Sequence, residues 1–201
     1  MIHEQFNHME VYAFQKAKHN DQFCGDSYFF TETDEYFLCA LADGLGSGKE
    51  AHESSMVAIA EIKAHYEQDS LEGLVRRANE AMKQMRGAVL TIFKMDFVRE
   101  ELTCISVGNI RLFVHSSTGK LTYPLPQSGY LSGRHCPLKI QTFPCEKESS
   151  FLIHSDGLDL RSPRQIGWRT PSIEEAYRLL LASISEDPPD DVTFLLGRLA
   201  K

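Results

Sequence analysis

The chain has 201 residues, 42% of them hydrophobic and 24% charged, which is the balance of an ordinary soluble domain that buries its own core. Its formal net charge of −7 argues against nucleic acid as a partner, because that role needs clustered Lys and Arg, and against an anionic membrane surface. No internal repeat, low-complexity tract or linker-like stretch is present, so we expect a single domain over residues 1–201.

The first half of the chain combines short strands with two consecutive helices. Apolar runs predict strands at Val11–Phe14, Ser27–Thr31 and Tyr36–Ala42. A stripe of helical periodicity begins near Ser47 and continues to Tyr66, with Ser47 as a candidate cap. A second stripe runs from Leu71 to Met85, with Asp69 or Ser70 as its N-cap.

The second half is mostly strands. They are predicted at Ala88–Asp96, Leu102–Val107, Arg111–Ser116, Leu121–Tyr123, Lys139–Phe143, Phe151–His154 and Val192–Arg198. One further helix is expected over Ile173–Ile184, with Ser172 as its N-cap. Strands and helices do not alternate along the chain, so we expect two antiparallel sheets with helices packed outside them rather than a doubly wound parallel sheet.

Aspartates occupy the ends of four predicted strands. Asp26 immediately precedes the second strand, Asp43 directly follows the third, Asp156 follows Phe151–His154, and the pair Asp190–Asp191 precedes the last strand. Carboxylates brought together from several strands repel one another and become stable when divalent cations lie between them. Oxygen ligands without His or Cys favour Mg²⁺ or Mn²⁺ over Zn²⁺. Paired ions of this kind serve the hydrolysis of phosphate esters. The alternative is that these acids are ordinary caps and turn residues.

The glycine-rich segment 44–49 offers a different interpretation, a loop that binds a nucleotide phosphate. A P-loop requires Ser or Thr after the lysine, whereas Glu50 follows Lys49 here. The dinucleotide-binding spacing also fails, because the third glycine is Gly48 instead of a glycine at position 49. We therefore expect the segment to turn the chain from a strand into a helix.

Taken together, five short motifs resemble the metal-dependent PPM/PP2C serine/threonine phosphatases, in that family's order and over almost the whole chain. The motifs are Gly25-Asp26-Ser27, Ala42-Asp43-Gly44-Leu45-Gly46-Ser47-Gly48, Ser106-Val107-Gly108-Asn109, His154-Ser155-Asp156-Gly157-Leu158 and Asp190-Asp191-Val192-Thr193. The variants are similar to the bacterial branch that controls sporulation and stress sigma factors, above all to the feedback phosphatase of the stressosome.

The resemblance implies an α+β fold, an α/β/β/α sandwich with two Mn²⁺ or Mg²⁺ ions at one end. In this family's pattern Asp43 bridges both ions, and Gly44 offers its carbonyl oxygen. Asp156 and Asp190 complete the ligands of one ion, and Asp26 serves the other, partly through water. The implied activity is hydrolysis of phosphoserine or phosphothreonine by direct attack of metal-bound hydroxide, without a phosphoenzyme.

The implied partners are phosphorylated scaffold and antagonist proteins of a stressosome, so that the enzyme acts as a negative feedback regulator of the general-stress sigma factor. The chain is expected to act as a cytoplasmic monomer without nucleic acid or a membrane as partner. Its cysteines are odd in number and lack metal-binding spacing, which fits a reducing compartment. The longest apolar run, Tyr36–Ala42, is far short of the roughly 20 residues that span a bilayer.

Some residues depart from the family's pattern. Leu45 replaces a histidine that acts as a candidate general acid in eukaryotic relatives, Gly25 replaces an acidic residue, and Asn109 replaces the acid associated with a third metal. Asp191 lies where the family often has Asn, and an exchange of roles with Asp190 remains open. Two alternatives follow: a catalytically silent module that keeps the fold, and a phosphatase for small molecules.

Weaker predictions concern residues around this site. Segment 129–137, which contains His135 and Cys136, is expected to form a mobile flap, and His154 is expected to pack beside the site rather than to bind a metal. Arg86 is either part of a surface turn or close to the cleft. Solvated loop arginines and a partly buried tryptophan are expected at Arg161, Arg164, Trp168 and Arg169.

Overall fold

Two antiparallel sheets form the centre of this computed structural model, which describes residues 2–160, 170 and 172–200. One sheet has the strand order β1 (Ile2–Gln5), β2 (Met9–Lys16), β11 (Val192–Leu199), β10 (Ser150–His154), β7 (Arg111–His115) and β8 (Leu121–Thr122). The other has the order β3 (Asp26–Glu32), β4 (Tyr36–Gly44), β5 (Ala88–Asp96), β6 (Glu101–Val107) and β9 (Ile140–Pro144). Every pair of neighbouring strands is antiparallel.

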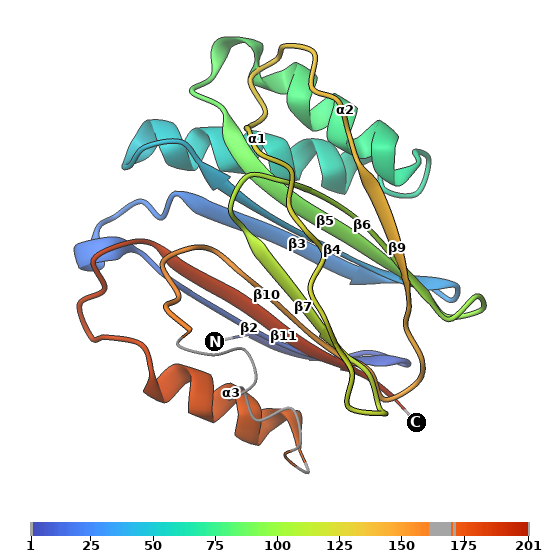
Figure 1. The fold of residues 1–201 in the computed structure, drawn as a ribbon. Helices are drawn as coiled ribbons and strands as arrows, with labels where there is room; N and C mark the ends of the chain where they lie inside the picture. The colour runs from blue at the N-terminus through green and yellow to red at the C-terminus, as the bar shows by residue number, and fades with distance from the viewer. Residues whose placement is uncertain (1, 161–169, 171, 201) are drawn as a thin grey trace.

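Helices cover the outer face of each sheet, which makes four layers (Figure 1). The helices α1 (Lys49–His65) and α2 (Leu71–Ala81) pack on the five-stranded sheet, and α3 (Ile173–Ala182) packs on the six-stranded sheet. Short 3₁₀ turns lie at η1 (Lys18–Asn20) and η2 (Met82–Gln84). The predicted α/β/β/α sandwich of two antiparallel sheets flanked by helices is therefore confirmed.

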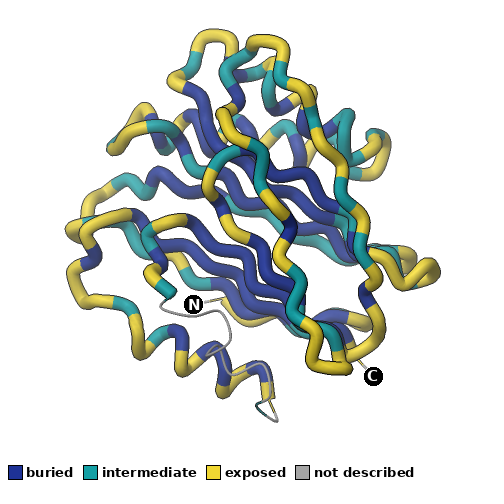
Figure 2. Tube along the Cα trace, viewed as in Figure 1, coloured by how far each residue is buried: buried dark blue, intermediate teal, exposed yellow. Residues whose placement is uncertain are grey.

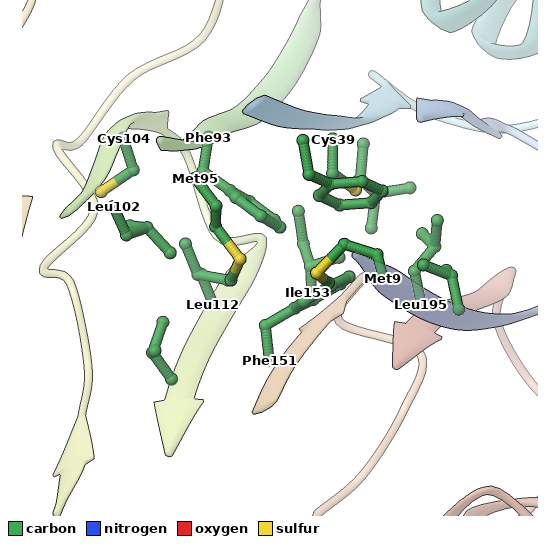
Figure 3. Packing of buried hydrophobic residues seen from close by; sticks show 14 of the residues in the cluster. Met9, Cys39, Phe93, Met95, Leu102, Cys104, Leu112, Phe151, Ile153 and Leu195 are labelled. Carbon is green, nitrogen blue, oxygen red and sulfur yellow. The ribbon is translucent and has the colours of Figure 1, made fainter. Parts of the chain in front are cut away.

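The largest hydrophobic core lies between the two sheets, and each sheet has a second core under its helices. In Figure 3, Phe93 and Cys39 from one sheet point toward Phe151 and Leu195 from the other. The strands nearest the middle are buried on both faces (Figure 2). This explains why they read as continuous apolar runs instead of alternating ones.

Strand β4 shows how one sequence serves two cores. Cys39 and Leu41 belong to the core between the sheets, whereas Leu38 and Ala40 belong to the core beneath α1 and α2. Successive side chains of a strand point to opposite faces, so a strand in the interior layer needs apolar residues at every position. The end of β4, which carries Asp43, is thereby fixed from both sides.

All ten predicted strands are present with small shifts of their ends. The predicted strand Ala88–Asp96 matches β5. The predicted strand Leu121–Tyr123 extends one residue beyond β8, and Lys139–Phe143 begins one residue before β9. Strand β1 was not predicted. All four of its residues are exposed, so it lacks the apolar face that sequence analysis detects.

Two of the predicted helix caps are confirmed, and one is wrong. The Ser70 hydroxyl accepts the Gly73 N–H at the start of α2, and the Ser172 hydroxyl accepts the Glu175 N–H at the start of α3. Ser47 does not cap α1, because the chain continues past it to Gly48, whose backbone adopts φ 74° without a side-chain cap. Arg161, Arg164, Trp168 and Arg169 lie outside the described residues. None of the helices in the described part of the chain is long and apolar enough to cross a membrane.

Candidate metal centre

The fold brings the acidic strand ends from both sheets to one end of the sandwich. Asp26 and Asp43 face each other across the antiparallel pair β3–β4. Asp156 follows β10 and Asp190 precedes β11, and these two strands are also antiparallel neighbours. A hydrogen bond of 2.7 Å from the Ser155 hydroxyl to Oδ2 of Asp26 joins the two halves.

A pocket of about 510 Å³ lies at this end of the molecule. Four of the five predicted site residues line it: Asp43, Gly44, Asp156 and Asp190. The rest of its wall consists of Leu45, Gly46, Val89, Gly108, Asn109, Ser128, Gly129 and Tyr130. Asp26, the fifth predicted residue, is not part of the wall; it is buried beside Asp43.

Asp26 is an incompletely satisfied buried carboxyl group. Its Oδ2 accepts the Ser155 hydroxyl, but its Oδ1 has no hydrogen-bond partner. Burial, and then the negative charge of Asp43, raise the pKa of Asp26 well above its ordinary value. A buried carboxylate oxygen without a partner is costly, and a nearby cation offsets that cost.

The carboxyl groups on the pocket wall repel one another. Burial is the largest influence on Asp43, followed by the charges of Asp156, Asp190 and Asp191, and together they raise its pKa to about 7. Burial and the charge of Asp190 also raise the pKa of Asp156. These residues therefore fit a divalent cation, which would favour the charged form of each carboxylate.

The carboxylates share a pocket but do not form a closed coordination shell. Across residues 2–160, 170 and 172–200, no three His, Cys, Asp or Glu side chains meet as a ready-made metal cluster. Hard cations such as Mg²⁺ commonly keep several water ligands and use one or two carboxylates. The pocket suits that mode, in which side-chain rotation, water and the Gly44 carbonyl complete the shell.

Asp190 and Asp191 differ in their surroundings. Asp191 is buried, and its two carboxylate oxygens accept the backbone N–H groups of Lys18 at 2.9 Å and Gly25 at 2.8 Å. Asp190 lines the pocket, and its Oδ1 accepts only the N–H of Asp191, at 2.9 Å. This arrangement supports Asp190 as the metal ligand and Asp191 as the residue that anchors the loop.

Two wall positions have a direct structural cause. A Cβ atom added to Gly44 would lie 1.9 Å from the carbonyl oxygen of Ala51, so no side chain fits between β4 and the start of α1. Leu45 packs against the core between the sheets. It gives the pocket an apolar patch where eukaryotic relatives of the family carry a histidine, and it cannot transfer a proton.

Two further polar side chains, those of Asn109 and Arg86, form contacts at or beside the pocket wall. The Asn109 amide donates a hydrogen bond of 2.7 Å to Oδ2 of Asp156, which fixes the direction of that carboxylate. Asn109 and Ser155 lie in the family motifs and Tyr130 in the expected flap, but the hydrogen bonds of Asn109 and Ser155 and the pocket position of Tyr130 were not predicted. Arg86 forms an ion pair with Glu50 and lies against the pocket residue Gly46.

His154 is placed as predicted, packed beside the site. It is buried and stacks on Phe113, with ring centroids 5.9 Å apart. Its Nδ1 lies 2.7 Å from the Ser155 carbonyl oxygen. Burial lowers the pKa of His154 to about 4, so the ring is neutral at physiological pH.

Comparison with known proteins agrees with this geometry. The family described as Stage II sporulation protein E (SpoIIE) matches residues 33–200. The phosphoserine phosphatase RsbX of Bacillus subtilis (strain 168) is 40% identical over 200 residues, which are 98% of each chain. The chain belongs to the SpoIIE family of PP2C-type phosphatases.

Two solved structures related to this SpoIIE-family chain extend the likeness to three dimensions. A crystal structure of RsbX in complex with magnesium has a TM-score of 0.93 at 39% identity and covers 99% of both chains. A structure from work on the bacterial stressosome has a TM-score of 0.82 at 27% identity and covers 94% of this chain and 99% of its own. The first of these relatives binds a divalent metal, in keeping with the donor set of the pocket.

Proposed function

We propose that this chain is a metal-dependent phosphatase that removes phosphate from serine and threonine residues of stressosome scaffold and antagonist proteins. The main observation in support is the single pocket lined by Asp43, Gly44, Asp156 and Asp190 in a chain 40% identical to a phosphoserine phosphatase. The relation to RsbX and to a structure from the stressosome supports the substrate class.

We assign two ions, Mn²⁺ or Mg²⁺, to the pocket. Asp43 would contact both ions, with the Gly44 carbonyl beside it; Asp156 and Asp190 would hold one ion, and Asp26 would hold the other, partly through water. Such ions activate water as a nucleophile and neutralise the charge of a phosphoryl group. The unpartnered Oδ1 of Asp26 supports its place in this set.

Two side chains beside the carboxylates would orient a metal ligand and keep part of the pocket apolar. Asn109 holds the Asp156 carboxylate in one direction through its hydrogen bond. Leu45 keeps one side of the pocket apolar, so the proton for the leaving-group oxygen would come from water or from another group. Transition-state charge would then be stabilised by the cations and not by a histidine.

The biological setting belongs to the same proposal. Dephosphorylation of scaffold and antagonist proteins would reset stress signalling, which makes the enzyme a negative feedback regulator of the general-stress sigma factor. We propose that it acts in the cytoplasm as a monomer, with residues 1–201 as one domain and without nucleic-acid or membrane partners. The net charge of −7 supports the last part.

The substitution Asp43→Asn tests the metal centre directly. Loss of the proposed shared ligand should reduce Mn²⁺-dependent turnover of an aryl phosphate by at least about 10³-fold, the scale expected when charge stabilisation is removed. The matched control is Asp34→Asn, because Asp34 is an exposed aspartate in the turn at the other end of the same β3–β4 hairpin. Retained activity in Asp43→Asn would contradict the proposal.

Substrate comparison separates this function from the two alternatives. We expect the wild-type enzyme to hydrolyse a phosphoserine-containing protein with a higher kcat/KM than free phosphoserine. Equal or reversed preference would indicate a small-molecule phosphatase. Absence of turnover on every phosphate ester, at saturating Mn²⁺ or Mg²⁺, would indicate a catalytically silent binding module.

A further inference from the structure

The loop between β8 and β9 links the catalytic pocket to helix α2. We refer to residues 127–138 as the 127–138 loop. Ser128, Gly129 and Tyr130 of this loop line the catalytic pocket. Residues 133–136 and 138 instead line a separate cavity of about 250 Å³ together with α2 and η2. The same short loop therefore touches the reaction site and a helix outside it.

Asn79 of α2 is the polar contact that holds the loop on the helix. Its Oδ1 accepts the backbone N–H of Ser132 at 3.0 Å and that of Gly133 at 3.2 Å. Its Nδ2 donates to the carbonyl oxygen of Arg134 at 2.7 Å. One carboxamide thus satisfies three consecutive residues of loop backbone, using both its acceptor and its donor capacity.

The loop is also fastened to the sheet immediately beside Tyr130. Leu131 and Ala88 exchange two backbone hydrogen bonds, of 2.8 Å and 3.1 Å. The Tyr130 ring lies so close to Gly87 that a Cβ atom added there would be 2.9 Å from it. The Gly87 carbonyl oxygen in turn accepts the N–H of Leu45, a residue of the pocket wall.

We propose that Asn79 is a positioning residue, which holds the 127–138 loop so that Tyr130 forms a substrate-contacting wall of the catalytic pocket. This inference rests on the proposed phosphatase function. Tyr130 is 48% exposed although its ring is seated on Gly87, so one face of the ring is available to a ligand. An aromatic ring with a hydroxyl group suits the backbone and apolar neighbours of a phosphorylated residue in a protein segment.

Tyr130 and Asn79 have different roles. Tyr130 contacts the substrate, whereas Asn79 has no place on the pocket wall and acts only through the loop. Without Asn79, the Leu131–Ala88 bridge still attaches the loop to the sheet, so the loop loosens without detaching. We therefore expect a loss of substrate positioning in a protein that remains folded.

The test combines amide exchange with a double-mutant cycle in the full chain. The variants are Asn79→Ala, Tyr130→Ala and the double variant, with Arg77→Ala as the matched control. Arg77 lies on the same helix and pairs with Asp69 instead of the loop. Hydrogen exchange of the Ser132 and Gly133 amides reports the loop without any need for activity.

The expected result has three parts. In Asn79→Ala the two amides exchange on the order of tenfold faster, and Arg77→Ala leaves them unchanged. Asn79→Ala and Tyr130→Ala each raise KM for a phosphoserine peptide by roughly tenfold and change kcat less, since they alter positioning rather than the metal ligands. The double variant is no worse than Tyr130→Ala, because Asn79 acts through that residue. Asn79→Asp, which keeps both acceptor bonds but not the donor, falls between the wild type and Asn79→Ala.

Three outcomes would overturn the inference. They are unchanged exchange at Ser132 and Gly133, an unchanged KM in Asn79→Ala, and multiplicative effects in the double variant. A wild-type enzyme that hydrolyses no phosphate ester with Mn²⁺ or Mg²⁺ would instead refute the proposed function on which the inference rests. Failure confined to the Asn79 and Tyr130 variants would leave that function intact.

Discussion

Asp190 and Asp191 are adjacent in sequence but have opposite tasks in the structure. The two carboxylate oxygens of Asp191 accept the N–H groups of Lys18 and Gly25, so Asp191 joins the loop before β3 to the start of β11. Asp190 lines the pocket, and the one hydrogen bond to its carboxylate from the described residues comes from the N–H of Asp191. The burial of one and the pocket position of the other support our proposal that Asp190, and not Asp191, is the metal ligand.

Substituting these two aspartates one at a time should separate the effect on stability from the effect on metal binding. Asp191→Ala is expected to lower the free energy of unfolding by about 3 kcal/mol, because it removes two hydrogen bonds to a charged acceptor. Asp190→Asn should leave the metal-free stability near the wild-type value while it weakens Mn²⁺ binding. Denaturant unfolding without metal and calorimetric titration with Mn²⁺ measure the two effects. A stability loss in Asp190→Asn equal to that in Asp191→Ala would contradict the assignment.

Sequence reasoning found the carboxylates because they lie next to strong strand signals. Asp43 follows an apolar run, and Asp156 follows another, so their placement at one end of a sheet could be argued from the pattern alone. The roles of Ser155 and Tyr130 could not be predicted in this way. Their roles depend on contacts between segments far apart in the chain, such as the hydrogen bond from Ser155 to Asp26.

At the scale of elements, the turn between β4 and α1 contributes Leu45 and Gly46 to the pocket wall. Gly48, the residue before α1, has φ 74° and ψ −155°, a conformation that is almost restricted to glycine. The glycine-rich segment was expected to turn the chain from a strand into a helix. The exact path of its backbone was not predicted, because a sequence does not specify which glycine adopts the unusual backbone angles. The helix therefore starts at Lys49 rather than under a Ser47 cap.

Two glycine substitutions, one just before α1 and one within α2, should differ in their effect on stability. Gly48→Ala is expected to destabilise the protein by about 1–3 kcal/mol through backbone strain alone, since no atom lies within 4 Å of the added Cβ position. Gly73→Ala, within the first turn of α2, should change the stability by less than about 1 kcal/mol, because the helix preference of alanine opposes a contact of 3.3 Å between the added Cβ and Cβ of Asp69. Thermal and urea unfolding of both variants checks the prediction. A similar stability for both would show that Gly48 tolerates a side chain.

Across the whole molecule, the sandwich collects negative charge at one end without enough positive charge to balance it. The pKa values of Asp26, Asp43 and Asp156 are all raised, first by burial and then by neighbouring carboxylates. A carboxyl group whose pKa is higher in the folded state stabilises that state at low pH, and this contribution is lost as the pH rises through the folded value. For Asp43 that loss begins above the ordinary pKa of a carboxyl group and levels off above a pH of about 7.

Metal binding should therefore stabilise the protein more strongly at higher pH. Between about pH 5 and about pH 7 the metal-free protein is expected to lose stability, while Mg²⁺ gains ligands that no longer have to release protons. At a concentration about 100-fold above its dissociation constant, the ion should add roughly 3 kcal/mol. Melting curves at both pH values, with and without Mg²⁺, test this expectation. A shift in Tm that is equal at both values, or larger at the lower one, would contradict it.

The architecture was predictable because its signals are local and repeated. The order of strands and helices pointed to antiparallel sheets, and the motifs resembled a known phosphatase family over nearly the whole chain. Strand β1 was missed because its exposed residues carry no apolar face. The pairing of β1 with β2 depends on backbone hydrogen bonds, which almost any side chain permits.

The N–H of Gly25 donates to Oδ2 of Asp191, so the residue types that fit at these two positions depend on each other. A Cβ atom on residue 25 would approach Oδ2 of Asp191 to 2.9 Å. An extra acid introduced at position 25 would meet the Asp191 carboxylate, each of whose oxygens already accepts one backbone N–H. Such a substitution would succeed only if position 191 were redesigned in the same step.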